Sequence, residues 1–546
     1  MGGSRIFVNG RTLNAREGAT LMECLVSSEL FLRMDCGGRG RCGKCVVRVA
    51  SGEWEGLSEP DEAEERNLGS GKLSQGYRLA CRARVRGAVS IEIPEESRLA
   101  QEVMRKGLPS LLPRTIPEVP APESATSDSW GVAVDIGTTT IAAYLCEMAS
   151  GTIAASTSVR NPQAVFGEDV VSRVGAVRSE PAVLPRLQQM AASAVNWAVS
   201  GLCRQAGIAP EHIIDMVCVG NSIMLHLFLG EDPSSIAVYP YTPRFSDART
   251  LPARDIGVCG ETHARLRTLP LISGYLGADI VGAALAADLM NAAPGTMLVD
   301  VGTNGEVIFV TEKGLMGTSC ATGPAFEGAS IRHGMQAVSG AVDSVRFSAE
   351  SGRLEYGVIR LDENVSVQPA GICGSGVISA VAELLDAGII RRDGGFDRNC
   401  GFPCMRIDGR GIPEVVIVPA EAAASGRAIV LTQADVRAVQ LAKGALRAGI
   451  DLLCRESGVS RPRKILLAGA FGSFIDRRAA LRIGMFPDMP VEEIEVVGNA
   501  AGAGAVMALL REEYFERAAE IAADTRVLDL ARHAGFQKTF VDSLSF

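Results

Sequence analysis

The stretch Met34-Asp-Cys-Gly-Gly-Arg-Gly-Arg-Cys-Gly-Lys-Cys45 places three cysteines on one glycine-rich loop. Five residues separate the first two cysteines and two residues separate the next two, while a fourth cysteine follows in Leu79-Ala-Cys-Arg82. The first gap is one residue wider than in plant-type [2Fe–2S] ferredoxins, but three close thiolates and one distant thiolate still suit that compact cluster. The predicted cluster ligands are Cys36, Cys42, Cys45 and Cys81.

Zinc and disulfide bonds are the two alternatives for these cysteines. A structural zinc site of this size usually has two C-x2-C pairs, and this stretch has one, at Cys42 and Cys45. Disulfides belong mainly to secreted proteins, and the N-terminus lacks the pattern of a signal peptide. Glycines between the cysteines allow positive φ, which lets backbone N–H groups approach the cluster sulfurs. The sequence therefore favours an iron–sulfur cluster.

The residues around the loop predict a ferredoxin-like β-grasp domain over residues 1–95. The dipeptide Asn9-Gly10 favours a hairpin turn, and Thr20 with Glu23 three residues later is typical of a helix start. The expected strands and short helix are residues 5–8, 11–14, 20–25, 46–50, 77–85 and 88–93. The stretch resembles [2Fe–2S] ferredoxins of adrenodoxin-like spacing, and such a domain transfers one electron at a time.

Length, charge and hydropathy limit the rest of the chain. At 546 residues the chain is too long for one core, so about three domains are expected. The net charge of −9 does not favour nucleic-acid binding. No run of 18 or more apolar residues and no signal-peptide core are present, which predicts a soluble, cytoplasmic protein without a membrane span.

Residues 96–127 predict a linker. Its prolines are Pro109, Pro113, Pro117, Pro120 and Pro122. Proline at this density disfavours helices and central strands and favours an extended, semi-rigid spacer. Such a spacer would let the cluster domain move between an electron donor and an acceptor, and a passive connector is the alternative.

Two distant stretches share one design, in which an apolar strand, an Asp-φ-Gly-Thr turn and a second apolar strand follow each other. The first stretch, residues 131–145, contains Asp135-Ile-Gly-Thr, and the second, residues 296–310, contains Asp300-Val-Gly-Thr. Repetition of this kind indicates an internal duplication. Each turn offers N–H groups and hydroxyls to phosphate oxygens, and each aspartate can reach Mg²⁺ directly or through water. The pair predicts a site for a nucleotide phosphate.

Two glycine-rich segments support a nucleotide site. Residues 465–474 form a strand-to-helix turn with small side chains where an adenosine would lie against the backbone, and residues 498–505 open a close-packed helix. The sequence has no G-x-x-x-x-G-K-[ST] motif, so this is not a P-loop protein.

These motifs resemble those of the acetate kinase, sugar kinase, Hsp70 and actin superfamily. The resemblance implies two RNase H-like ATPase domains, residues 128–295 and 296–546, with ATP in the cleft between them. The predicted fold class is therefore a multidomain α+β and α/β protein: a β-grasp [2Fe–2S] ferredoxin domain, a proline-rich linker and two RNase H-like domains. By resemblance, the nucleotide-contacting residues are Gly137, Thr138 and Thr139, then Gly302, Thr303 and Asn304, with Gly469, Ala470, Phe471 and Gly472 near the adenosine.

Carboxylates are the candidate catalytic groups. Asp135 and Asp300 are expected to bind Mg²⁺ or to orient the attacking water, while Glu306 and Asp279 are further candidates. Asn221 ends an apolar strand, so it is expected either near the phosphates or as an ordinary turn residue.

One glutamate and two histidines say less about function. Glu327 could contact nucleotide or a protein partner, and the sequence does not decide between them. His226 lies in the apolar run Met224-Leu-His-Leu-Phe228, so a core position is favoured over a cobalt ligand. His333 raises the same question.

Together the two halves resemble the reductive activators of corrinoid proteins, in which a ferredoxin precedes an acetate-kinase-like domain. Further stretches carry the resemblance: residues 161–174, 220–227, 321–331 and 368–377. The resemblance implies an ATP-hydrolysing Co(II)-corrinoid reductase that restores Co(I) in a methyltransferase or O-demethylase system. Its implied partners are a corrinoid protein and an external electron donor, and its cofactors are a [2Fe–2S] cluster, ATP and Mg²⁺. A homodimer is compatible with the resemblance.

Two other functions remain open from the sequence. A small-molecule kinase with a redox-sensing ferredoxin domain would transfer phosphate to a soluble metabolite, although no second sugar-binding signature is present. A plain electron carrier, whose ATPase-like part is only a docking scaffold, would turn over no nucleotide.

Overall fold

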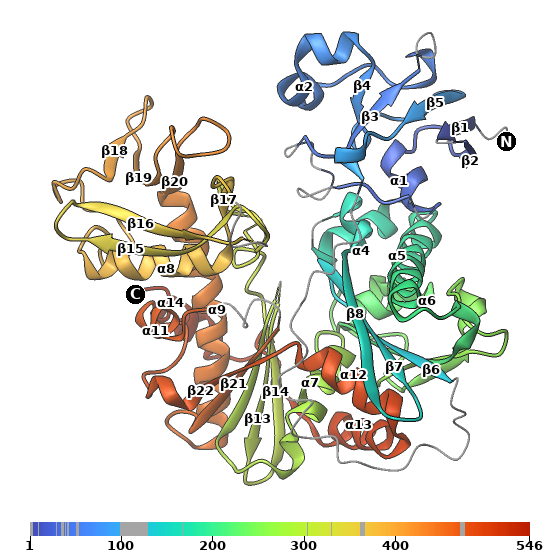
Figure 1. Cartoon of the computed structure of the whole chain (residues 1–546). Helices are drawn as coiled ribbons and strands as arrows, with labels where there is room; N and C mark the ends of the chain where they lie inside the picture. The colour runs from blue at the N-terminus through green and yellow to red at the C-terminus, as the bar shows by residue number, and fades with distance from the viewer. Residues whose placement is uncertain are drawn as a thin grey trace. The chain divides into compact units, whose positions relative to one another are not determined.

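The computed structural model of this chain describes residues 4–8, 10–28, 30–33, 38, 40, 43–50, 54–98, 129–167, 169–302, 304–328, 330–360, 366–469 and 475–546 (Figure 1). The described residues form two compact units. The first holds the N-terminal part through Leu269 together with Leu509–Arg511, and the second holds Pro270–Ala508 and Glu512–Phe546. Among the described residues, no helix is both long and apolar enough to cross a lipid bilayer. From residue 99 on, the predicted linker lies outside the described residues.

The first unit begins with a five-stranded sheet in the order β2-β1-β5-β3-β4. Its elements are β1 (Ser4–Val8), β2 (Arg11–Ala15), α1 (Leu21–Val26), β3 (Val46–Val49), α2 (Glu62–Ser74), β4 (Tyr77–Leu79) and β5 (Val89–Glu92). Val8 pairs with Arg11, which confirms the hairpin predicted at residues 9–10. Thr20 caps α1 and accepts a 3.2 Å hydrogen bond from the Glu23 backbone N–H, which confirms the predicted helix start.

One strand expectation is wrong at its end. The strand expected over residues 77–85 stops at Leu79, because the chain turns there. The backbone N–H groups of Arg82 and Ala83 both donate to the Leu79 carbonyl, at 2.8 and 2.9 Å. This turn carries Cys81.

The first unit continues with a six-stranded sheet in the order β10-β11-β9-β6-β7-β8. Its strands are β6 (Trp130–Ile136), β7 (Thr140–Glu147), β8 (Thr152–Arg160), β9 (Ile213–Val219), β10 (Arg249–Pro252) and β11 (Arg265–Thr268). The helices beside it are α4 (Val170–Ser179), α5 (Val183–Ala206) and α6 (Ser222–Leu229). Helix α5 packs on β7 and β8, and its buried face is rich in alanine, valine and leucine.

The second unit contains another six-stranded sheet, in the order β22-β21-β12-β13-β14-β23. Its strands are β12 (Thr296–Val301), β13 (Gly305–Thr311), β14 (Gly314–Cys320), β21 (Lys464–Ala468), β22 (Ile494–Gly498) and β23 (Arg526–Val527). Its helices are α7 (Ala278–Ala286), α8 (Gly374–Asp386), α9 (Gln433–Ser457), α11 (Arg477–Arg482), α12 (Ala500–Leu510), α13 (Glu512–Asp524) and α14 (Phe536–Asp542). Two three-stranded sheets complete it: β15 (Ala341–Ser348), β16 (Arg353–Val358) and β17 (Gly371–Ile372), and β18 (Met405–Ile407), β19 (Pro413–Val418) and β20 (Ile429–Thr432).

The two six-stranded sheets share a topology. In each, three consecutive strands form an antiparallel meander, β6-β7-β8 and β12-β13-β14. A later strand, β9 or β21, pairs in parallel with the first strand of the meander. The internal duplication that the two Asp-φ-Gly-Thr turns indicate is therefore present in the fold, and it is the RNase H-like arrangement that was predicted.

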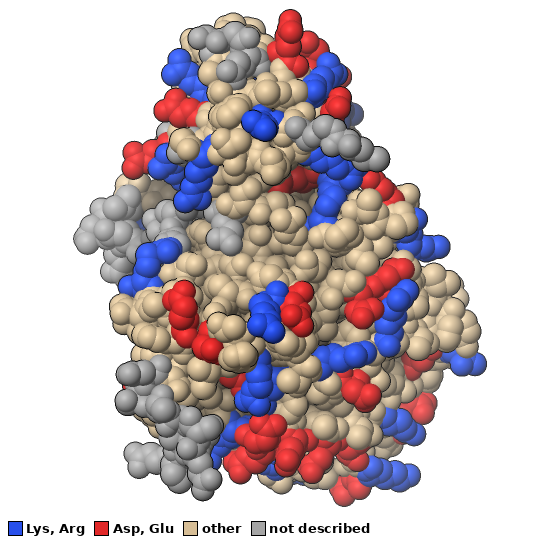
Figure 2. All heavy atoms as spheres, turned by 90° about the vertical axis from the view of Figure 1, so that its right-hand side faces the viewer, with Lys and Arg blue, Asp and Glu red and all other residues tan. Residues whose placement is uncertain are grey.

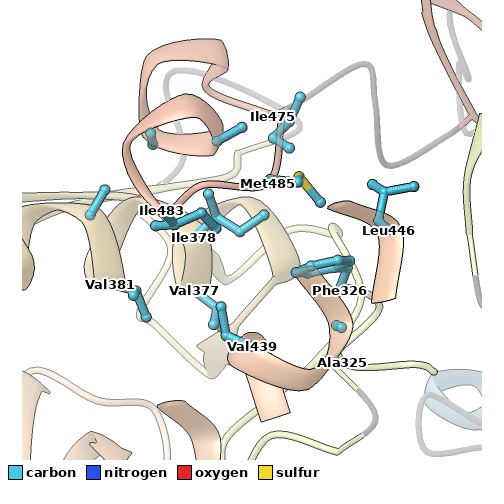
Figure 3. Packing of buried hydrophobic residues seen from close by; sticks show 14 of the residues in the cluster. Ala325, Phe326, Val377, Ile378, Val381, Val439, Leu446, Ile475, Ile483 and Met485 are labelled. Atoms are coloured by element: carbon cyan, nitrogen blue, oxygen red, sulfur yellow. The ribbon is translucent and has the colours of Figure 1, made fainter. Parts of the chain in front are cut away.

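Apolar packing between helices holds the second unit together (Figure 3). Val377, Ile378 and Val381 of α8 lie in one buried cluster with Val439 and Leu446 of α9. The phenyl ring of Phe326 fills part of the same cluster and is 2% exposed. At about 25 cal/mol per Å² of buried apolar surface, such a cluster dominates the favourable side of folding. On the face drawn in Figure 2, which is the right-hand side of Figure 1, Lys, Arg, Asp and Glu are interspersed among other residues.

Candidate functional site

Cys45 and Cys81 form the described half of the predicted cluster site. Cys45 directly precedes β3 and Cys81 follows β4 by two residues, and antiparallel pairing of Val46 with Leu79 brings the two cysteines together. Their Sγ atoms are 3.3 Å apart, and both residues are buried, at 2% and 4% exposure. Two thiolates on one tetrahedral ion, with bonds of about 2.3 Å, would be ~3.8 Å apart. The pair therefore fits two ligands of one metal ion with a small relaxation.

The backbone near these cysteines is held by α2. Gly40 has φ +65°, and a Cβ there would lie 2.8 Å from the Cβ of Ala63 and 2.9 Å from Cδ of Arg82. The Gly40 carbonyl accepts a 2.7 Å hydrogen bond from Nδ2 of Asn67. The Arg82 guanidinium donates a 2.7 Å hydrogen bond to the Asp61 carboxylate, and this lowers the Asp61 pKa against the opposing effect of burial. A larger residue at position 40 would displace the loop from α2.

Two of the four predicted ligands, Cys36 and Cys42, lie outside the described residues. Ligation by the set of four therefore stays a prediction. Burial raises the pKa of Cys146 and Cys24 to about 12, which disfavours the thiolate form at these two positions.

The first predicted phosphate loop joins β6 to β7. Asp135 is the penultimate residue of β6, and Gly137–Thr139 make the turn. A Cβ at Gly137 would lie 2.5 Å from the Thr140 carbonyl oxygen, so the turn requires glycine there. Asn221 caps α6, and its Nδ2 donates a 3.0 Å hydrogen bond to Oγ1 of Thr138. Asn221 is thus a helix-capping residue that also contacts this loop, and its expected place near the phosphates stays a prediction.

A buried arginine that sequence reasoning missed also supports this loop. Arg173 of α4 is 0% exposed, and its guanidinium donates to the carbonyls of Thr138 and Gly167, at 2.6 and 2.9 Å, and to Oε1 of Gln163 at 3.2 Å. Asn161 adds a 2.9 Å hydrogen bond from Nδ2 to the Gly137 carbonyl. The resemblance had singled out residues 161–174, but no spacing rule predicts that an arginine will bind a carbonyl 35 residues away.

The second predicted phosphate loop joins β12 to β13, in the second unit. Asp300 is again the penultimate residue of the first strand. Gly302 donates its N–H to the Asn304 carbonyl at 3.0 Å. Gly469, directly after β21, has φ +92°, and a Cβ there would lie 2.5 Å from Oδ1 of Asp300. Thr303, Ala470, Phe471 and Gly472 lie outside the described residues, so their predicted nucleotide contacts remain predictions.

Three carboxyl groups influence each other beside this loop. Glu306 lies directly opposite Asp300 in the β12–β13 pairing and is buried. Burial, followed by the negative charges of Asp279 and Asp300, raises the pKa of Glu306 well above its usual range. The folded protein therefore favours the protonated form of Glu306 more than water does. Within the described residues, no three His, Cys, Asp or Glu side chains are placed to hold a metal ion by themselves, and Mg²⁺ at phosphate sites commonly takes most ligands from phosphates and water.

The predicted close-packed helix is present as α12. A Cβ at Gly504 would lie 2.0 Å from the carbonyl oxygen of Gly282 in α7, so the two helices touch backbone to backbone. Asn499 accepts a 3.0 Å hydrogen bond from the Gly502 N–H at the start of α12. This packing fixes α7, whose first turn carries Asp279.

The histidine expected in the core is there. His226 is 0% exposed, contacts the Ser222 carbonyl through Nδ1 at 2.6 Å, and accepts the Arg244 N–H through Nε2 at 3.0 Å. Its ring stacks on Phe245 with centroids 4.4 Å apart. Both ring nitrogens have hydrogen-bond partners within the protein, which confirms the prediction that His226 is a core residue. Glu327 and His333 are both half-buried, and their roles stay open.

Comparison with protein-family models divides the chain into three matches. The 2Fe-2S iron-sulfur cluster binding domain matches residues 6–86. The RACo middle region matches residues 130–292, and the C-terminal domain of RACo, the ASKHA domain, matches residues 295–546. These matches confirm the predicted fold class, and they confirm the predicted cofactors, a [2Fe–2S] cluster and ATP with Mg²⁺.

Individual relatives agree with the family models. The corrinoid activation enzyme RamQ of Eubacterium limosum is 28% identical over 594 residues, covering 98% of this chain and 97% of the relative. The Co(II) methylated amine-specific corrinoid protein reductase of Methanosarcina barkeri is 28% identical over 333 residues, 55% of each chain. A solved structure, the reductive activator for corrinoid, iron-sulfur protein, aligns with a TM-score of 0.70 and 28% identity, covering 100% of this chain and 98% of the other.

Proposed function

We propose that this chain, which resembles the reductive activators of corrinoid proteins along its whole length, is itself an ATP-dependent reductase of a corrinoid protein. In the proposed reaction one electron passes to the Co(II) of the partner's corrinoid and yields Co(I), while ATP is hydrolysed to ADP and phosphate. An external donor then returns one electron to this chain. The single observation that carries the proposal is the full-length match to RamQ, with 98% of this chain covered.

The combination of sites also supports the proposal. A ferredoxin-type cysteine pair, Cys45 and Cys81, occurs in one chain with two Asp-φ-Gly-Thr hairpins, at Asp135 and Asp300. When bound, the [2Fe–2S] cluster supplies electrons one at a time. The comparisons do not favour the kinase alternative.

ATP is needed for a thermodynamic reason. If electron transfer to Co(II) were uphill by about 240 mV, the equilibrium would lie about four decades toward the reactants, which is roughly 5.5 kcal/mol. Nucleotide can shift this equilibrium only if the protein binds the two states of its partner with different affinity. We propose that the ATP-bound form binds the corrinoid protein in a state whose cobalt has lost an axial ligand, since that raises the cobalt potential.

The chain's own residues have distinct proposed tasks. Asp135 and Asp300, each one residue before the end of its strand, would hold Mg²⁺ or orient the water that attacks the terminal phosphate. Arg173 would keep the Gly137–Thr139 turn in one shape by binding the Thr138 carbonyl. Glu306, whose pKa is raised by burial and by the charges of Asp279 and Asp300, would act in its protonated form as a proton donor or hydrogen-bond donor beside Asp300.

The test is anaerobic visible spectroscopy of Co(II) corrinoid proteins with this chain and a low-potential reductant. A panel should include corrinoid proteins of O-demethylation, methylamine use and acetyl-CoA synthesis. We expect the Co(I) spectrum to form with at least one of them when Mg-ATP is present and to stay small without it. Equal Co(I) yields with and without Mg-ATP would contradict the proposal, as would phosphoryl transfer to a soluble metabolite.

A further inference from the structure

A short segment of the first unit touches both the cluster loop and the first phosphate loop. This segment consists of the 3-10 helix η3 (Pro162–Val165) with its cap Asn161 and the following Phe166; we call it the connecting segment. On one side, Gly38 of the cysteine loop lies against it, since a Cβ at Gly38 would be 3.3 Å from Cγ1 of Val165 and 3.8 Å from Cβ of Cys81. Gly38 therefore lies between the segment and Cys81, a predicted cluster ligand.

On its other side the connecting segment is hydrogen-bonded to the first predicted phosphate loop. Asn161 donates from its backbone N–H to the Thr139 carbonyl at 2.8 Å and from Nδ2 to the Gly137 carbonyl at 2.9 Å. Oε1 of Gln163 accepts from Arg173, whose guanidinium also binds the Thr138 carbonyl. All three residues of the Gly137–Thr139 turn are thus hydrogen-bonded either to the segment or to Arg173 of α4, which itself binds Gln163 of the segment. A change in the turn's shape must move these partners or break their bonds.

Arg186 of α5 joins the segment to the ferredoxin domain. Its guanidinium lies over the Phe166 ring, 4.7 Å from the ring centroid, and forms an ion pair with Glu23 of α1. The side chains of Arg186 and Glu23 are only 24% and 12% exposed, so water screens this pair weakly. A second ion pair, Arg16 with Glu180 at 2.7 Å, is exposed and contributes little.

An aromatic contact completes this interface. Phe31, in the loop after α1, lies 5.5 Å from Trp197 of α5 between ring centroids, and Phe31 is 8% exposed. Helices α1 and α5 pack against each other here (Figure 1). The ferredoxin domain is therefore docked on α5 through α1 and Phe31, and Gly38 of this domain lies against Val165 of the connecting segment.

We propose that the connecting segment couples the first phosphate loop to docking of the ferredoxin domain, with Arg186 as the positioning residue, so that nucleotide on the loop releases the domain. The inference rests on the proposed function, in which the ferredoxin domain must leave α5 to bring its predicted cluster to the corrinoid of another protein. Coupling of this kind is reciprocal: if nucleotide weakens docking by some factor, loss of docking strengthens nucleotide binding by the same factor.

The experiment uses the full-length holoprotein with a fluorophore pair introduced through noncanonical amino acids at two exposed positions, Thr12 of β2 and Glu211 of the first unit. High energy transfer reports the docked domain. We expect a non-hydrolysable ATP analogue with Mg²⁺ to lower the transfer. Arg186→Ala should lower it without nucleotide, while Arg204→Ala, an exposed arginine on the same helix, should leave it unchanged.

Nucleotide affinity gives the second readout. Because docking opposes nucleotide binding in this scheme, Arg186→Ala should bind the ATP analogue about five-fold or more tightly than the wild type, and Arg204→Ala should match the wild type. A structural defect in Arg186→Ala would not tighten binding. If the analogue binds but leaves energy transfer unchanged, or if Arg186→Ala undocks the domain without changing nucleotide affinity, the coupling is wrong while the proposed function stands. Failure of the wild type to bind nucleotide at all would contradict both.

Discussion

Gly469 and Asp300 are in backbone-to-carboxylate contact across the parallel strands β21 and β12. A Cβ at Gly469 would come within 2.5 Å of Oδ1 of Asp300 and 3.0 Å of the Val301 carbonyl, and Gly469 has φ +92°. The glycine is therefore required twice, for its conformation and for the space that the carboxylate occupies. Gly469 was predicted to lie near the adenosine, and its lack of a side chain also leaves room for Asp300, a proposed catalytic residue.

Gly469→Ala should displace Asp300 and lower the ATPase kcat by more than ten-fold. The matched control is Gly458→Ala, at the C-cap of α9, where φ is +77° and nothing lies within 4 Å of the added Cβ. Each variant should lose about 1–2 kcal/mol of stability through left-handed strain, measured by urea unfolding. Equal ATPase activity in the two variants would show that the Asp300 position does not matter for hydrolysis.

Glu306 should make stability depend on pH. Its folded pKa is raised by burial, Asp279 and Asp300, so the folded state holds a proton that the unfolded state releases above its ordinary glutamate pKa. The contribution is therefore most favourable below that ordinary pKa and is lost as pH rises toward the folded value, at up to about 1.4 kcal/mol per pH unit. Glu306→Gln cannot ionise and should lack this slope.

The measurement is the free energy of unfolding from pH 5 to pH 8 without Mg²⁺ or nucleotide. The stability of Glu306→Gln relative to the wild type should increase with pH. Glu312→Gln, at an exposed position just after β13, is the control and should follow the wild-type curve. Parallel curves for all three proteins would mean that Glu306 ionises normally.

Arg173→Lys tests whether the shape of the first phosphate loop matters. Lysine keeps the charge but cannot reach the Thr138 carbonyl, the Gly167 carbonyl and Gln163 at once, as the guanidinium does. Buried acceptors left unsatisfied cost about 1–3 kcal/mol each. We expect the KM for ATP to rise at least ten-fold and the melting temperature to fall.

The control for Arg173→Lys is Arg178→Lys, on the exposed side of the same helix. This variant should keep the wild-type KM and melting temperature. An unchanged KM in Arg173→Lys, despite a lower melting temperature, would limit Arg173 to a purely structural role.

The sequence indicated residues that belong to a local strand–turn–strand pattern. It missed a residue whose hydrogen-bond partner is far away along the chain. Asp135 and Asp300 each lie between an apolar run and a Gly-Thr turn, so the adjacent residues alone predict the strand–turn–strand pattern. Arg173 reads as an ordinary helical arginine, because its partner is a carbonyl 35 residues earlier that no side-chain pattern records. The expected strand over residues 77–85 is also cut short by contacts between backbone groups, since the chain turns after Leu79.

Asn221 shows an intermediate case. Its place after an apolar strand left two alternatives, a turn residue or a residue near the phosphates; in the structure Oδ1 caps α6 while Nδ2 binds Thr138 of the predicted phosphate loop. A side chain with a donor and an acceptor can serve two neighbours at once. The sequence shows where Asn221 lies along the chain, but it does not show that the two ends of its amide contact different elements.

Cys81→Ser should separate electron delivery from nucleotide turnover. Serine at this position removes one of two sulfurs that lie 3.3 Å apart, so the chain should fail to retain a [2Fe–2S] cluster and should show no paramagnetic iron signal after dithionite reduction. Co(I) formation should then be lost, while hydrolysis of ATP should persist, because the two Asp-φ-Gly-Thr hairpins are untouched. Cys146→Ser is the matched control: Cys146 is buried in β7 of a different sheet and lies outside the predicted ligand set, so both activities should remain. Normal cluster content in Cys81→Ser would remove Cys81 from the ligand set and with it the cluster site described for β3 and β4.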